Sequence, residues 1–188
     1  MTTWRLAYIV GLVILLPGLA DAQPQLCLVV GVSDGDTITA RCGTPGVYDQ
    51  IKVRLSAIDA PESKQAFGQR SKQALSALCY MTEATITPKT KDRYGRTVAD
   101  VQCRGQDAAR HMVAGGWAWY YTRYGKGYEH LAGIEAEARA ARRGLWVEPG
   151  AVEPWEWRKR PKNQHQHVTI METVEKNSEK SGIWTKLS

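Results

Sequence analysis

Five charged side chains in three short stretches carry the chemistry that this sequence offers. They are Asp36 in S-D-G-D, then Arg54, Asp59 and Glu62 in R-L-S-A-I-D-A-P-E, and Arg96 in D-R-Y-G-R. Carboxylate oxygens suit Ca²⁺ or Mg²⁺, so Asp36 and Asp59 are candidate metal ligands. The two arginines can grip a phosphate and stabilise added negative charge. Glu62 is then the candidate general base for water, and the set contains the parts needed to hydrolyse a phosphodiester.

Each stretch also has a purely structural interpretation. Asp34 and Asp36 flank a glycine, where aspartate is common in turns. Residues 58–62 can be the polar loop that ends a strand, and residues 89–96 can be the solvated tip of a hairpin rather than a phosphate clamp. The functional interpretation therefore requires that the three stretches meet in the fold.

Strands are the elements that must position these side chains. Apolar and polar residues alternate over 51–57, which predicts a half-buried strand that ends before Pro61. Residues 26–32 and 37–41 flank an Asp-Gly turn and predict a hairpin. Two further strands are predicted over 84–88 and 97–103, with a cationic and aromatic connector between them.

Helices are predicted from apolar residues at helical spacing. The first covers 66–80, the second is capped by Asp107 and ended by Gly115-Gly116, and the last begins near Leu131 and closes at Arg142-Arg143-Gly144. Five strands with a helix between the third and fourth follow the order of an OB-type barrel. The expected fold class is α+β, a five-stranded OB-type β-barrel with three α-helices.

The chain divides into a leader, one domain and a tail. Arg5 precedes an apolar run over 6–16, and Ala20-Asp21-Ala22 fits a cleavage site, so residues 1–22 are expected to be a signal peptide. The run is shorter than the roughly 20 residues that span a bilayer, so no stable membrane insertion is expected after cleavage. The expected domain covers 23–157, and 158–188 is expected to be a flexible polar and basic tail. A secreted or periplasmic protein is expected.

Export gives the four cysteines a role, because an even number in an oxidising compartment favours disulfides. Cys27 and Cys42 flank the predicted hairpin turn, so we expect them to pair across it. The remaining pair is then Cys79, at the end of a predicted helix, with Cys103, at the end of a predicted strand. No C-x-x-C motif is present, which argues against zinc.

Charge and aromatic content favour a polyanionic partner. The formal net charge is +6, and tyrosines and tryptophans gather in G-W-A-W-Y-Y-T-R-Y over 116–124. Some of these rings must belong to the core, but others can stack on bases or sugars. Charge by itself is weak support, since many exported proteins are basic.

As an ordered set, these motifs resemble the staphylococcal nuclease (thermonuclease) family. The matching stretches are D-G-D-T at 34–37, R-L-S-A-I-D-A-P-E at 54–62, D-R-Y-G-R at 92–96, G-W-A at 116–118 and A-R-R-G-L-W at 141–146. The likeness covers about residues 26–157. It implies an SNase-like OB-fold domain that hydrolyses DNA and RNA with little sequence specificity and depends on Ca²⁺.

The resemblance also implies a role for each matching residue. Asp36 and Asp59 take the calcium-ligand positions, and Ala60 takes the position that binds through its backbone carbonyl. The catalytic positions are Arg54, Glu62 and Arg96.

Substrate contacts follow from the same likeness. Arg93 and Tyr94 match residues that contact a terminal phosphate. The tyrosine that stacks on a base is not fixed by the motif, because Tyr120, Tyr121 and Tyr124 compete; Tyr121 and Tyr124 are our candidates. A monomer that binds DNA and RNA is expected.

Two other classes of protein share some of these features. A non-catalytic nucleic-acid-binding module on the same barrel would have lost acidic and arginine positions, whereas all five are present here. An envelope or cell-surface interaction protein would act through the basic tail. Deletion of 158–188 would abolish the activity of such a protein but would leave a nuclease its turnover.

Overall fold

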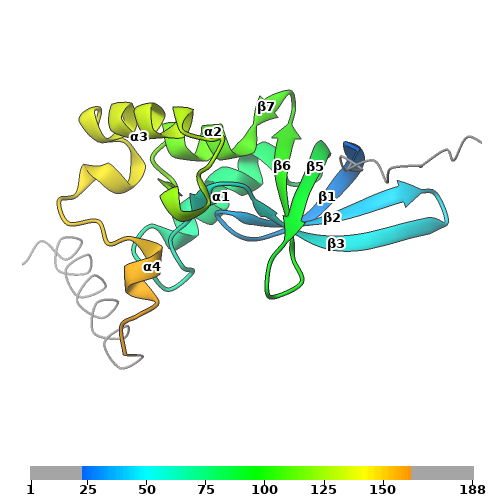
Figure 1. The fold of residues 1–188 in the computed structure, drawn as a ribbon, viewed down its shortest axis with the longest axis horizontal. Helices are drawn as coiled ribbons and strands as arrows, with labels where there is room; N and C mark the ends of the chain where they lie inside the picture. The colour runs from blue at the N-terminus through cyan, green and yellow to red at the C-terminus, as the bar shows by residue number, and fades with distance from the viewer. Residues whose placement is uncertain (1–22, 162–188) are drawn as a thin grey trace, which may run out of the picture.

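Five strands close into a barrel in the computed structural model, which describes residues 23–161; the predicted signal peptide lies outside the described residues. The strands are β1 (Gln25–Asp34), β2 (Thr37–Thr44), β3 (Val47–Leu55), β5 (Glu83–Lys91) and β6 (Thr97–Cys103). They are hydrogen-bonded in the order β3-β2-β1-β5-β6, and a parallel pairing of β3 with β6 closes the barrel. The predicted α+β class with a five-stranded OB-type barrel is confirmed (Figure 1).

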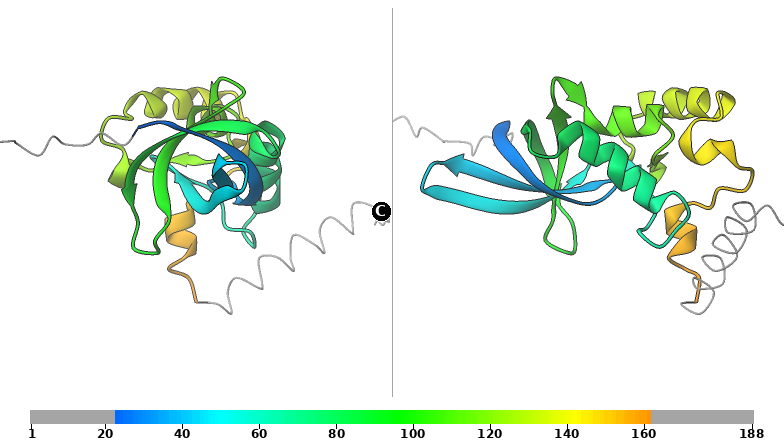
Figure 2. Two further views of the ribbon diagram at one scale, coloured as in Figure 1. Left: turned by 90° about the vertical axis from the view of Figure 1, so that its right-hand side faces the viewer. Right: turned by 180° about the vertical axis from the view of Figure 1, so that it is seen from behind.

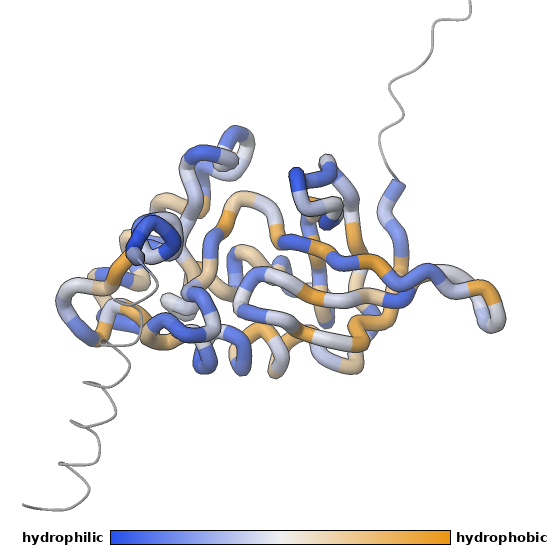
Figure 3. Tube along the Cα trace, turned by 90° about the horizontal axis from the view of Figure 1, so that it is seen from below, coloured by the Kyte–Doolittle hydropathy of each residue, from blue (hydrophilic) through white to orange (hydrophobic). Residues whose placement is uncertain are grey.

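Alternation of apolar and polar residues explains which side of each strand faces the core. Val29, Ile38, Ala40, Val53 and Leu55 are buried inside the barrel, and Figure 3 shows hydrophobic and hydrophilic residues alternating along the strands. The strands β2 and β3 extend further than the alternation predicted. Their outer ends pair with each other as an arm that projects from the barrel (Figure 1).

Three helices of about two turns or more accompany the barrel, as predicted. The helix α1 (Gly68–Cys79) packs on β1, while α2 (Ala108–Ala114) packs against α3 (His130–Ala140). Figure 2 shows α1 alongside the barrel and the other two helices beyond one end of it. Asp107 caps α2 as expected, since its carboxylate accepts a hydrogen bond from the backbone N–H of Arg110 at 2.8 Å. No helix within residues 23–161 is long and apolar enough to span a bilayer.

The last predicted helix is shorter than expected. The helix α3 ends at Ala140, before the basic triplet, and Gly144–Val147 forms a separate 3₁₀ turn, η2. Gly144 has a φ of +53°, and a Cβ there would lie 2.2 Å from the carbonyl oxygen of Gly116. Leu145 donates a backbone hydrogen bond to that same carbonyl at 2.8 Å. The helix has already ended before this point, because Arg142 adopts a positive φ of +49°, and the close approach to Gly116 fixes the turn that follows.

The strand predicted over 51–57 also ends earlier than predicted. Ala57 has a φ of +59°, in the left-handed region, so β3 stops at Leu55 and the chain turns. A short strand β4 (Ile58–Asp59) follows and pairs with β8 (Trp119–Tyr120).

The remaining short elements are β7 (Gln106–Asp107), the 3₁₀ turn η1 (Thr122–Tyr124) and a four-residue helix α4 (Pro154–Trp157). The sequence analysis did not predict α4.

Both predicted disulfides are present. Cys27 and Cys42 are directly opposite each other on β1 and β2, with their Cα atoms 4.3 Å apart. Cys79 at the end of α1 is bonded to Cys103 at the end of β6, with a Cα separation of 5.3 Å. The second bond joins a helix to the barrel, and no free cysteine remains among the described residues.

Candidate active site

The turn between β1 and β2 delivers Asp36 to the centre of the site. Gly35 allows this turn to lie close against α1, because a Cβ there would fall 1.8 Å from Ser71 Oγ. The backbone carbonyl of Asp36 accepts a hydrogen bond from Leu55 N at 2.8 Å, which ties the turn to the end of β3. Asp59 arrives from β4, which is fixed by its pairing with Trp119. Two turns that are distant in sequence are thereby placed side by side.

Arg54 joins the two carboxylates that these turns provide. Its Nη1 lies 2.7 Å from Asp36 Oδ2, and its Nη2 lies 2.9 Å from Asp59 Oδ1. The same Nη2 donates to the carbonyl oxygen of Ile58 at 3.1 Å. Both carboxylates are almost fully buried, with exposed fractions of 3% for Asp36 and 0% for Asp59. A half-buried guanidinium between two buried carboxylates makes a charge-assisted hydrogen bond to each of them in a geometrically specific arrangement.

Electrostatics at the β1–β2 turn keep one carboxyl ionised and favour a proton on its neighbour. Burial alone would raise the pKa of Asp36, but the ion pair with Arg54 and the N–H of Ala60, 2.9 Å from Asp36 Oδ2, hold it below its usual value. Burial, together with the charge of Asp36, raises the pKa of Asp34 to about 7. The turn therefore contains one carboxyl group whose pKa is lowered and one whose pKa lies near neutrality.

The tip between β5 and β6 positions Arg96. Asp92 Oδ2 accepts from Arg96 Nε at 2.7 Å, and Asp92 Oδ1 accepts from the backbone N–H groups of Tyr94 and Arg96. Arg96 Nη1 reaches Thr37 Oγ1 at 3.4 Å, and that hydroxyl donates to Asp36 Oδ1 at 2.8 Å. Arg96 is thus connected to Asp36 through one hydroxyl group, which places the tip beside the carboxylates.

The two candidate phosphate contacts lie at the same tip. Arg93 Nη2 donates to Tyr94 Oη at 2.6 Å, and both side chains are exposed. The guanidinium of Arg96 lies 5.5 Å from the centre of the Tyr94 ring. The structure brings the three residues together at the tip, and Arg96 connects the tip to Asp36 through Thr37.

Glu62 lies close to Asp59 but is not free of partners. Its Oε1 is 2.7 Å from Nη1 of Arg158, and Nη2 of Arg158 pairs with Asp59 Oδ2. The sequence analysis missed Arg158 and counted it with the tail. A signal was available: Pro154 followed by Glu156 fits the first turn of a helix, and that helix α4 carries Arg158 to the site.

Of the three competing tyrosines, two face each other beside the site. Tyr120 packs on the hydrophobic core, and its hydroxyl donates to the carbonyl oxygen of Gly125 at 3.0 Å. Tyr121 and Tyr124 form an edge-to-face pair with ring centres 5.4 Å apart. Trp155 of α4 stacks on Tyr121 at 5.0 Å. Tyr124 is 66% exposed, so of these three tyrosines it is the most open to a base.

The donor set fits a hard divalent cation. Asp36, Asp59 and the backbone of Ala60 offer oxygen atoms only, and no histidine or cysteine lies among them. Within residues 23–161, no three acidic, histidine or cysteine side chains gather as a metal cluster. A site built from two carboxylates and a backbone carbonyl is consistent with that finding.

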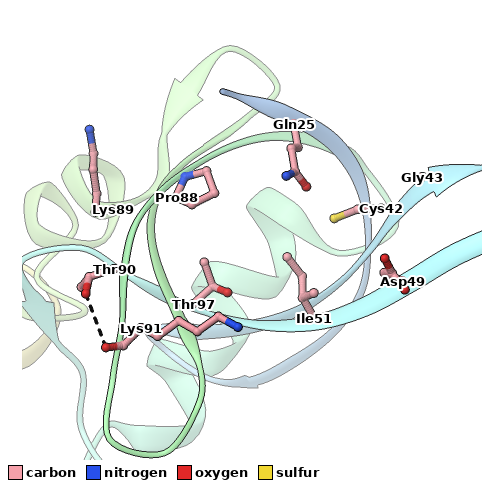
Figure 4. A pocket seen from close by; sticks show the side chains of 10 residues that line it. All are labelled: Gln25, Cys42, Gly43, Asp49, Ile51, Pro88, Lys89, Thr90, Lys91 and Thr97. Carbon is pink, nitrogen blue, oxygen red and sulfur yellow. Dashed lines mark hydrogen bonds between the residues drawn. The ribbon is translucent and has the colours of Figure 1, made fainter. Parts of the chain in front are cut away.

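A hollow of about 560 Å³ opens at another part of the barrel (Figure 4). Its lining includes Cys42, Ile51 and Thr97, with Lys89 and Lys91 from β5. None of the candidate metal-binding or catalytic residues lines it. The hollow and the cluster of candidate site residues are therefore separate parts of the molecule.

Comparison with known proteins agrees with this geometry. The family model described as "Staphylococcal nuclease homologue" matches residues 52–148. An "Uncharacterized endonuclease" of Haemophilus influenzae is 44% identical over 140 residues, which are 74% of this chain and 76% of that protein. A "Micrococcal nuclease" of Shigella flexneri is 42% identical over 164 residues, covering 82% of this chain and 90% of that protein.

Another relative matches over a shorter stretch. The "Staphylococcal-like nuclease CAN1" of Arabidopsis thaliana is 41% identical over 110 residues, which make up 58% of this chain and 34% of that protein. The matched family region begins two residues before Arg54 and includes Asp59, Glu62 and Arg96. A barrel of this topology, this cluster of charges and these relatives lead to one conclusion: the chain belongs to the staphylococcal nuclease family and is a nuclease.

Proposed function

We propose that this protein is an exported, Ca²⁺-dependent nuclease that hydrolyses the phosphodiester bonds of DNA and RNA with little sequence preference. The observation that carries the proposal is the pairing of Arg54 with two buried carboxylates, Asp36 and Asp59, beside Glu62 and Arg96. The name of the Shigella flexneri relative, a micrococcal nuclease, supports the same function.

In this proposal Asp36, Asp59 and the carbonyl of Ala60 hold the calcium ion. When bound, the ion supplies Lewis-acid polarisation of the phosphate and charge neutralisation. Arg54 and Arg96 donate hydrogen bonds to the phosphate oxygens and stabilise the charge that develops in the transition state. Their separate anchors, on β3 and on the β5–β6 tip, allow them to approach one phosphate from two directions.

Glu62 accepts the proton of the attacking water in this scheme. Its side chain is 41% exposed, so water can reach it, whereas the buried Asp59 is reserved for the ion. Arg93 and Tyr94 contact a neighbouring phosphate, and Tyr121 and Tyr124 stack on a base. Contacts to phosphate and to the face of a base carry little sequence information, which explains the lack of sequence preference.

A digestion assay on the purified mature chain tests this function. Supercoiled plasmid and a single-stranded RNA are incubated with Ca²⁺, with Mg²⁺ or with chelator. Cleavage of both substrates only with Ca²⁺ is the expected result. Full activity in chelator would disprove metal dependence, and cleavage of one nucleic acid alone would narrow the substrate.

The proposed export rests on the leader and is supported by the two disulfides, which suit an oxidising compartment. We propose that the mature protein starts near Gln23 and acts as a monomer in the periplasm or outside the cell. The intact mass of the exported protein tests the cleavage site, and retention of residues 1–22 would disprove it. Light scattering of the same sample tests the monomer.

A further inference from the structure

Arg158 lies inside the charge cluster of the active site although it follows Asp59 by 99 residues. Its Nη2 is 2.5 Å from Asp59 Oδ2, and its Nη1 is 2.7 Å from Glu62 Oε1. The Nη1 group also lies 3.3 Å from Asp59 Oδ1. One guanidinium therefore spans a proposed calcium ligand and the proposed base.

The helix that carries Arg158 is held in place by contacts of its own. Trp157 is only 4% exposed, and Trp155 stacks on Tyr121 with ring planes 28° apart. Gln65 is a third attachment, because its Nε2 donates to the carbonyl oxygen of Val152 at 2.5 Å while its Oε1 accepts from Glu62 N at 3.1 Å. Arg158 thus reaches the site from a built element rather than from the end of a free tail.

The contacts of Arg158 use the oxygen atoms that a metal ion would need. Asp59 Oδ1 already accepts from Arg54, and Asp59 Oδ2 accepts from Arg158. An ion that binds Oδ2 would lie next to the guanidinium there, and two cations on one buried carboxylate oxygen repel each other strongly. Metal binding therefore opposes the Arg158 contact to Oδ2.

Charge balance points in the same direction. Asp36, Asp59 and Glu62 are three carboxylates, and Arg54 neutralises one of them. The negative charge that remains matches one divalent cation. Arg158 neutralises only half of this remainder, so it can fill the site when no ion is bound but leaves the cluster favourable to a doubly charged ion.

We propose that Arg158 competes with the divalent cation for Asp59 and Glu62, so that binding of the metal displaces its guanidinium. The inference rests on the proposed metal dependence of this nuclease. It makes Arg158 a third arginine of the active site, with a different role from Arg54 and Arg96. The role is to compensate the buried charge of Asp59 in the ion-free enzyme, which sets the affinity for metal lower than the carboxylates alone would give.

Calorimetric titration of Ca²⁺ into metal-free protein, without nucleic acid, tests the proposal. The samples are the full mature chain, R158A, R158M and the control K159A. Lys159 is the neighbouring cation on the same segment and forms an ion pair with Glu156 at 2.7 Å, so K159A removes equal charge outside the contacts of Arg158 with Asp59 and Glu62. R158M keeps the length of the side chain, so it gives the answer if R158A does not fold.

We expect R158A and R158M to bind Ca²⁺ about tenfold more tightly than the unmodified chain, the scale of one hydrogen-bonded ion pair lost to the competitor. K159A should bind as the unmodified chain does. Equal or weaker Ca²⁺ affinity in folded R158A or R158M would overturn the proposal and leave Arg158 as an anchor of α4 or an organiser of the metal ligands.

The result is separable from the proposed function itself. If neither the unmodified chain nor the Arg158 variants bind Ca²⁺ and digestion proceeds in chelator, the metal dependence is wrong and the competition fails with it. If the unmodified chain binds Ca²⁺ and is activated by it, but the Arg158 variants show no tighter binding, only the competition is wrong.

Discussion

Arg54 illustrates how much of this site is decided by single residues. Its two terminal nitrogens hold Asp36 and Asp59, which come from different turns, at the ends of one planar fork. A lysine has one donor group and no such fork, so it would not bridge both carboxylates in the same way. The pairing also explains why two carboxylates can be buried here at all, since unpaired buried charge is strongly unfavourable.

Arg96→Ala is expected to lower turnover by at least about a hundredfold, the scale of losing one charge-stabilising donor. Substrate affinity should change little, because the contact is made mainly in the transition state. Added Ca²⁺ should not restore the activity. Steady-state kinetics on plasmid DNA measure this, with Arg110→Ala, an exposed arginine of α2, as the control. Near-normal turnover in Arg96→Ala would show that Arg96 is not catalytic and belongs to a solvated hairpin tip.

Asp36→Ala should behave differently from Arg96→Ala. Loss of a metal ligand weakens the binding of the ion, so part of the activity should return as the Ca²⁺ concentration is raised. A titration of activity against Ca²⁺ distinguishes the two variants. An Asp36→Ala curve that reaches the same low plateau without any shift to higher Ca²⁺ would exclude a ligand role for Asp36.

Asp34→Asn is expected to stabilise the metal-free protein at neutral pH and above. The pKa of Asp34 is raised to about 7 by burial and by Asp36. The folded state therefore binds more protons than the unfolded state between about pH 4 and about pH 7, and stability falls as pH rises through that window. The variant should gain about 1–3 kcal/mol above pH 7 and nothing near pH 4.

Urea unfolding in chelator, repeated across that pH range, measures the difference. Asp49→Asn is the matched control, because Asp49 is an exposed carboxylate on β3. A gain in stability that does not vary with pH would show that the charge of Asp34 is not the cause.

Among the elements, strands were predictable from sequence and their ends were not. Alternation located β3, the Asp-Gly turn between apolar runs located β1 and β2, and the two further predicted strands coincide with β5 and β6. The ends depend on single residues that leave the regular conformation: β3 stops before Ala57 adopts a positive φ, and α3 stops before Arg142 does. Neither residue is marked by a periodic pattern in the sequence.

The β5–β6 tip provides the prediction at this scale. Asp92 accepts three hydrogen bonds, two from the backbone of the tip and one from Arg96 Nε. Asp92→Ala should lower turnover about tenfold or more by misplacing the Arg96 guanidinium. Asp92→Asn keeps an oxygen for the backbone hydrogen bonds, so its turnover should lie between that of the unmodified protein and that of Asp92→Ala. Steady-state kinetics test both variants, and equal turnover in all three proteins would show that Arg96 does not depend on the tip.

At the scale of the whole molecule, the part of the site that sequence could not predict is the part assembled over the longest separations. Asp36, Arg54, Asp59 and Arg96 were predicted to meet, and the structure brings them together. The contact of Arg158 with Asp59, and that of Gln65 with Val152, join segments 87 or more residues apart through a four-residue helix. Such contacts are selected by tertiary packing, so local propensity does not indicate them.

The two disulfides should differ in what their loss does to the molecule. The bond between Cys27 and Cys42 links strands that are already joined by the β1–β2 ladder, whereas the bond between Cys79 and Cys103 ties α1 to β6, which no ladder joins. Each bond is expected to contribute roughly 2–4 kcal/mol by restricting the unfolded chain.

The double variant Cys79→Ser with Cys103→Ser should therefore lose at least as much stability as Cys27→Ser with Cys42→Ser, and also loosen α1. Because α1 packs against the Asp36 turn through Ser71 and Gly35, activity should become more sensitive to temperature in the variant that lacks the Cys79–Cys103 bond. Urea unfolding and the temperature dependence of turnover measure the two effects. A greater loss from removing the cross-strand bond would show that the helix is held by its packing alone.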